Sequence, residues 1–74
     1  MRPLAAYTIR PATAADQRTL QLLAVLDSRR PLDGEILVAE KDGVVVAALS
    51  RTQRRAIADP FRHTAQALDL LRAA

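Results

Sequence analysis

The 74-residue sequence contains neither cysteine nor tryptophan, and it has only one tyrosine, one phenylalanine and one histidine. Without cysteine there is no disulfide, and no ligand spacing suits a structural metal, so packing or a partner chain must hold the fold together. Few aromatic residues also argue against a stacking platform for single-stranded nucleic acid. Because no run approaches about 18 apolar residues, the sequence predicts no membrane span.

The small size of the chain limits what it can bury. Residues 1–74 make at most one small domain, and such a domain buries only about 60% of the surface that its unfolded chain exposes. We therefore expect a thin stability margin and a tendency to form homo-oligomers. Residues 1–7 lack the long apolar core of a signal peptide, which predicts a cytoplasmic protein.

Positive charge is concentrated in one part of the sequence. The formal net charge is +3, and four arginines fall between positions 51 and 62, where Asp59 is the one acidic residue. Two interpretations are open for this cluster: a solvated strand edge and loop, or a site for phosphate, a coenzyme or nucleic acid. The cluster consists of Arg51, Arg54, Arg55 and Arg62.

The first third of the chain predicts a strand followed by a helix. Residues 7–12 combine β-forming residues with alternating polarity, which favours a strand. Thr13 and Asp16 have the spacing of a capping box, with Asp in place of Glu, and this marks a helix start. Apolar residues at helical spacing follow, and the helix should end before Pro31. Its expected buried stripe comprises Ala15, Leu22, Leu23 and Leu26.

The remaining residues predict a hairpin, a further strand and a second helix. Residues 35–40 and 44–49 flank an Asp-Gly pair that favours a tight turn. Both runs are apolar on both faces, so the sheet is either covered on two faces or covered on one and paired on the other. Residues 54–58 form a weaker strand, and residues 64–74 form a helix capped by Thr64 or a slightly earlier residue. The order β-α-β-β-β-α predicts an α+β fold, with two helices on a mainly antiparallel, four-stranded sheet.

The order and spacing of these segments resemble a known family. "TIRPATAAD" opening on a capped helix, and "ILVAEKDGVVVAAL" as a hairpin, are similar to the N-terminal half of the GNAT superfamily of N-acetyltransferases. The resemblance covers residues 7–71 and implies a partial GNAT-like fold. In that family a glycine-rich loop after the fourth strand binds the pyrophosphate of acetyl-coenzyme A. The same register places a degenerate loop here, with Arg62, Ala65, Gln66 and Ala67 as cofactor-binding candidates.

Two departures from the family pattern weaken the case for an enzyme. Ala65 occupies a glycine position of the loop, and its methyl group opposes the close approach of a diphosphate to the backbone. The family's fifth strand and its later tyrosine have no counterpart before Ala74. We therefore expect a truncated GNAT-like half domain that needs a second chain to complete an acetyltransferase site.

Catalytic residues are not predicted anywhere in the chain. His63 has no second histidine or activated nucleophile beside it in the sequence. Glu35 and Glu40 are five positions apart, which places them on opposite faces of a strand. Ser28 and Ser50 lack the G-x-S-x-G context of a nucleophilic serine.

Three functions therefore remain open. The first is a non-catalytic module that assembles as a homo-oligomer through the edge of the fourth strand, or with a protein partner, and needs no cofactor. The second is an acetyl-CoA-binding N-acetyltransferase completed across a dimer interface. The third is a small basic nucleic-acid-binding module.

Overall fold

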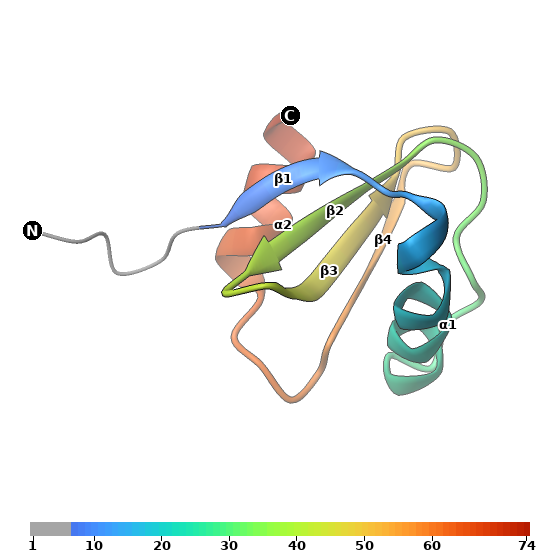
Figure 1. Ribbon diagram of the computed structural model, residues 1–74, viewed down its shortest axis with the longest axis horizontal. Helices are drawn as coiled ribbons and strands as arrows, with labels where there is room; N and C mark the ends of the chain where they lie inside the picture. The colour runs from blue at the N-terminus through green and yellow to red at the C-terminus, as the bar shows by residue number, and fades with distance from the viewer. Residues whose placement is uncertain (1–6) are drawn as a thin grey trace, which may run out of the picture.

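The computed structural model describes residues 7–74, so residues 1–6, on which the expectation of no signal peptide rests, lie outside this range. All neighbouring strands of the sheet pair antiparallel, in the spatial order β1-β2-β3-β4. The predicted α+β fold and its order of elements are confirmed for the described residues (Figure 1). The elements are β1 (Thr8–Pro11), a 3-10 turn η1 (Ala14–Asp16), α1 (Gln17–Leu26), β2 (Ile36–Lys41), β3 (Val44–Ser50), β4 (Arg55–Ala58) and α2 (Ala65–Ala73).

The two helices cover opposite faces of the sheet (Figure 1). Leu23 and Ala24 of α1 pack on one face, over β3 and β4. Ala67 and Leu71 of α2 pack on the other face, over β2 and β3. Coverage on both faces is one of the two arrangements that the apolar strands allowed, and it explains why β2 and β3 are apolar throughout.

A β-bulge at Val46 decides which residues of β3 reach each face. Ala39 of β2 lies opposite Ala47, whereas the next residue, Glu40, lies opposite Val45. Val46 is therefore an extra residue without a partner in this register. Because of it, Val46 and Ala47 both face α2 in succession, while Val45 belongs to the core beneath α1.

The buried stripe of α1 agrees with the predicted one only in part, since Leu23 is buried and Leu26 is half-buried. Leu20, Leu23 and Ala24 pack in the core, whereas Ala15 and Leu22 are exposed. Leu20, Leu23 and Ala24 have the i, i+3, i+4 spacing of a single helix face. Ala15 belongs to η1, which has about three residues per turn, so its angular position does not continue that of α1.

Local signals in the sequence set the ends of several elements. The predicted capping box between Thr13 and Asp16 is present. The hairpin turn has positive φ at Asp42 (54°) and Gly43 (80°), as a two-residue type I′ turn requires. Thr64 stands at the N-cap of α2 as predicted, but its side chain caps no amide. Its backbone (φ −111°, ψ 3°) lies outside the β region from which an N-cap side chain reaches the helix.

The two glycines of the chain allow a matched test of the close contact between Gly34 and the Thr52 side chain. Gly34 and Gly43 both have positive φ (86° and 80°), but only at Gly34 would a Cβ overlap another side chain, that of Thr52. We predict that Gly43→Ala lowers the free energy of unfolding by about 1 kcal/mol, because an L-residue adopts this conformation at a cost. Gly34→Ala should lower it by about 3 kcal/mol, because the overlap adds to that cost. Equal losses of unfolding free energy for the two variants in urea denaturation would contradict the close contact between Gly34 and Thr52.

Candidate functional site

The predicted pyrophosphate loop lies between the end of β4 and the first turn of α2. Arg62, Ala65 and Gln66 are exposed there, whereas the side chain of Ala67 is fully buried in the core beneath α2. Ala67 and Leu71 are four residues apart and form the buried stripe of this helix. Three of the four predicted site residues therefore face solvent, and the fourth contributes its side chain to packing.

Asp59 organises this loop and partly neutralises its charge. The Nε of Arg62 lies 3.4 Å from Asp59 Oδ2, and the Phe61 amide donates to Asp59 Oδ1 at 2.9 Å. The Arg62 amide also donates to the Asp59 carbonyl, at 3.3 Å. An anion approaching Arg62 therefore meets a guanidinium that already has a carboxylate partner.

A groove of about 340 Å³ runs along the outer edge of β4, between the end of α1 and α2. The Asp59 amide donates to the Val46 carbonyl at 3.0 Å, so the alternating pattern of an antiparallel pair turns the amides of Ala56 and Ala58 away from β3. The Ala58 amide donates instead to Asp27 Oδ2 at 3.1 Å. The end of α1 thus covers one position of this edge. The lining of the groove includes Asp27, Ala56, Arg62, Thr64, Leu68 and Arg72.

The arginine cluster of the sequence is divided in space. Arg51 and Arg54 lie in or beside the turn between β3 and β4, where Arg51 Nε is 3.7 Å from Glu35 Oε1. Arg55 begins β4 and donates to the carbonyls of Arg30 and Pro31. Arg62 lies beyond the opposite end of β4. The four side chains therefore form no single basic patch of the kind that nucleic-acid binding would use.

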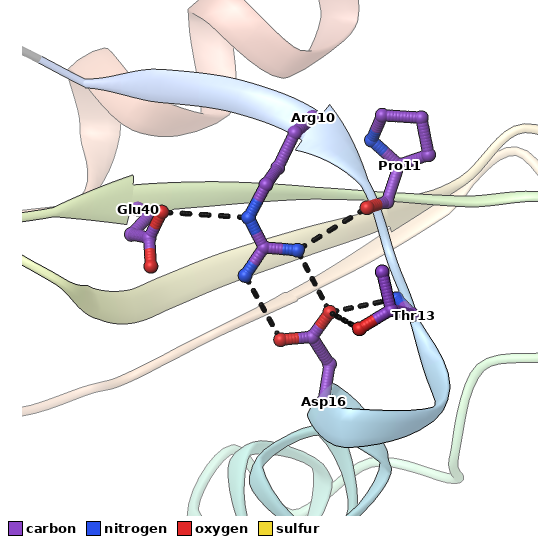
Figure 2. A network of polar contacts seen from close by, with 5 residues as sticks. All are labelled: Arg10, Pro11, Thr13, Asp16 and Glu40. Carbon is purple, nitrogen blue, oxygen red and sulfur yellow. Dashed lines mark hydrogen bonds and ion pairs between the residues drawn. The ribbon is translucent and has the colours of Figure 1, made fainter.

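The most strongly perturbed ionisable groups among residues 7–74 are Arg10 and Asp16, which Figure 2 shows as one network. The Nη1 and Nη2 of Arg10 donate to Asp16 Oδ2 and Oδ1 at 2.8 and 2.9 Å. The Thr13 amide also donates to Asp16 Oδ2, at 2.7 Å, and Arg10 Nε donates to Glu40 Oε1 at 3.4 Å. The Arg10 guanidinium, and after it the Thr13 amide, hold the pKa of Asp16 well below its usual range. Asp16, and after it Glu40, raise the pKa of Arg10.

This network joins elements of the fold and is not suited to proton transfer. Asp16 is buried, and hydrogen bonds from Arg10 and Thr13 occupy both of its carboxylate oxygens. A carboxylate held ionised in this way neither donates nor accepts a proton near neutral pH. The sequence pattern predicted a capping role for Asp16 but did not predict its pairing with Arg10. The only feature of the sequence that indicates this pairing is the place of Arg10 near the end of the strand before the cap. We interpret the pair as the connection between β1 and the start of α1.

No three His, Cys, Asp or Glu side chains among residues 7–74 lie together so that they would hold a metal ion. No helix within the same residues is long and apolar enough to cross a bilayer.

Comparison with protein-family models, curated proteins and solved structures gives no match for this chain. The GNAT resemblance therefore stays a prediction that rests on the order and spacing of the elements.

The Arg10–Asp16 connection predicts a specific loss of stability. Asp16→Asn keeps the shape of the side chain but removes the charge that Arg10 pairs with, so we expect the free energy of unfolding to fall by about 2 kcal/mol. Asp69→Asn, on the exposed side of α2, is the matched control and should change it by less than about 0.5 kcal/mol. Urea denaturation of both variants measures the difference.

The same pair predicts how this difference depends on pH. The pKa of Asp16 is lower in the folded chain than its ordinary value of 3.8, so its stabilising contribution is complete above that value and is lost as the pH falls below it. The gap in stability between wild type and Asp16→Asn should therefore shrink as the pH is lowered from about 6 to about 3. A gap that stays constant over this range would contradict a contribution from the charge of Asp16.

Proposed function

We propose that the chain is a non-catalytic module that assembles with a second copy of itself through the outer edge of β4. Within residues 7–74, β4 pairs with β3 alone. Ala56 directs its amide and carbonyl away from β3, and Ala58 does the same. An edge of this kind is a template for another strand, and this is the observation that carries the proposal.

The charges at the two ends of β4 favour an antiparallel arrangement of the copies. A two-fold axis through Ile57 places Ala56 opposite Ala58 of the copy, so that two small side chains meet. It also places Arg55 opposite Asp59 of the copy at both ends of the pair. Opposite charges facing each other across two strands contribute about 0.2–1 kcal/mol. Both residues already have partners in their own chain, so these contacts orient the pairing more than they strengthen it.

Asp27 is the group that such pairing has to displace. Its Oδ2 accepts the hydrogen bond of the Ala58 amide at 3.1 Å, and in the paired state this amide would donate to the carbonyl of Ala56 in the copy. A hydrogen bond to a carboxylate is thereby exchanged for a neutral one, which limits the gain from pairing. We therefore expect weak association, with a dissociation constant on the order of 100 µM.

Two variants should change this association in opposite directions. Ala56→Pro removes an outward-facing amide without breaking the pairing to β3, so it should abolish dimer formation. Asp27→Ala frees the Ala58 amide and should strengthen the dimer about fivefold. Ala14→Pro is the matched control, because its preceding residue, Thr13, is extended (φ −118°, ψ 173°) and accepts a following proline.

Sedimentation velocity over a range of protein concentrations measures this association. Circular dichroism of each variant confirms that it remains folded. A wild type that stays monomeric up to about 1 mM would contradict the proposal, because a dimer weaker than this is not populated at ordinary protein concentrations. An Ala56→Pro variant that associates like the wild type would show that a different surface is used.

A second candidate function, binding of acetyl-coenzyme A by an N-acetyltransferase completed across a dimer interface, is favoured by the groove beside β4. Arg62, Thr64 and Arg72 line this groove, and the first turn of α2, whose dipole attracts anions, begins directly after Thr64. The carboxylates of Asp27 and Asp59 line it as well, and they repel a diphosphate. This balance of charges makes the coenzyme the weaker of the two candidates.

Calorimetric titration with acetyl-coenzyme A tests this second candidate. Ala65→Gly removes the methyl group that opposes the diphosphate, so it should raise the affinity about fivefold if the coenzyme lies at this loop. Ala73→Gly makes the same change at the far end of α2 and should leave the affinity unchanged. If the two variants titrate alike, or if neither they nor the wild type give heat, the coenzyme does not bind at this loop.

A further inference from the structure

The chain's single tyrosine, single phenylalanine, single histidine and single lysine meet in one hollow. This hollow has a volume of about 320 Å³. Tyr7 and His63 are 56 positions apart in the sequence, yet the Tyr7 hydroxyl donates to the His63 carbonyl at 3.4 Å. Phe61 and His63 are neighbours in the sequence, and the fold brings Tyr7 and Lys41 to them. The lining consists of Tyr7, Lys41, Val46, Phe61, Arg62 and His63.

Four separate segments build this hollow at one end of the sheet. Tyr7 directly precedes β1, and Lys41 is the last residue of β2. Figure 1 shows that the start of β1, the turn between β2 and β3 and the loop between β4 and α2 lie at the same end. The bulge in β3 turns Val46 onto this side, where it is buried as part of the lining. β-Bulges often stand next to functional sites because they re-aim a side chain.

The charge of this hollow is positive. Lys41 and Arg62 line it together with His63, and no carboxylate is among its lining residues. The Nζ of Lys41 lies 5.6 Å from the centre of the Tyr7 ring, and none of the ion pairs within residues 7–74 involves Lys41. An anion that enters the hollow would therefore meet the Lys41 ammonium group without having to compete with a carboxylate for it.

The same hollow offers an uncovered aromatic ring. Phe61 is 82% exposed, the highest exposure among the large apolar residues of the described chain. A planar ring that stacks against Phe61 removes apolar surface of both groups from water and has the geometry that aromatic pairs favour. The volume of about 320 Å³ lies near the lower limit of the roughly 300–1,000 Å³ typical of small-molecule sites. The hollow therefore suits a ligand with one ring.

We propose that this hollow binds a small planar aromatic anion, a single ring that bears a phosphate or a carboxylate. The ring lies against Phe61 and Tyr7, and the anionic group is held mainly by Lys41. Arg62 adds to this as a second cation that is shared with Asp59. The hollow shares Arg62 with the groove beside β4, but neither Ala56 nor Ala58, whose amides would pair in the dimer, lines it. Loss of self-association therefore leaves this proposal unaffected.

The aromatic region of the NMR spectrum tests the proposal directly. The chain has no tryptophan and one each of tyrosine, phenylalanine and histidine, so every ring signal of the ¹³C-labelled full chain comes from the hollow. Unlabelled phenyl phosphate is the probe. We expect saturable shifts of the Phe61, Tyr7 and His63 signals, with a dissociation constant on the order of 1 mM. Inorganic phosphate alone and phenol alone should each bind at least about fivefold more weakly, because each makes half of the contacts.

Substitutions separate the contributions of the charge and the ring. Lys41→Gln and Phe61→Ala should each weaken the binding of phenyl phosphate about fivefold, and Lys41→Arg, which keeps the charge, should retain it. Arg18→Gln, on the exposed side of α1, is the matched control and should leave binding unchanged. Backbone amide spectra of each variant verify the fold.

Three results would overturn the proposal. The first is the absence of saturable shifts in the wild type. The second is an affinity for inorganic phosphate or phenol equal to that for phenyl phosphate. The third is unchanged binding by a folded Lys41→Gln variant.

Discussion

The extra residue in β3, Val46, is the constraint on which both cores of the molecule depend. Side chains of a regular strand alternate between the two faces, so a shift of one residue moves every following side chain to the other face. The bulge supplies this shift inside β3, and it lets Ala47 pack under α2 while Val45 packs under α1. It also places Val46 in the hollow at the end of the sheet. One local irregularity thus serves the packing and the candidate ligand site together.

Carboxylates attach α1 to the sheet at both of its ends. Asp16, just before the helix, is held by Arg10 of β1, and Asp27, just after it, accepts from the Ala58 amide of β4. A helix of ten residues is marginal by itself in water, so its tertiary contacts decide whether it forms. The same Asp27 contact shields one amide of the β4 edge. The stability of the fold and the accessibility of its edge are therefore coupled through this residue.

Features that depend on neighbouring residues could be predicted from the sequence. The Asp42-Gly43 turn and the Thr13–Asp16 capping box are both present, because their geometry is set within a few residues. The bulge could not be predicted because residues 44–49 are uniformly apolar. Such a run has no alternation of polar and apolar residues that a bulge would visibly interrupt. Leu23 of the predicted α1 stripe is buried, but Ala15 was placed wrongly because the 3-10 turn before the helix has a different period. The hollow was missed because its lining comes from distant segments, and burial of Ala67 was overlooked although Leu71, four residues on, indicated it.

Nuclear Overhauser contacts of the Val46 methyl groups test the central claim most directly. With the bulge as described, these methyl groups face α2, so contacts to the Tyr7 ring or the Leu71 methyl groups are expected, and contacts to Leu23 are not. Contacts between Val46 and Leu23 would place Val46 on the face beneath α1. That result would contradict the register of β3, the separation of the two cores and the construction of the hollow.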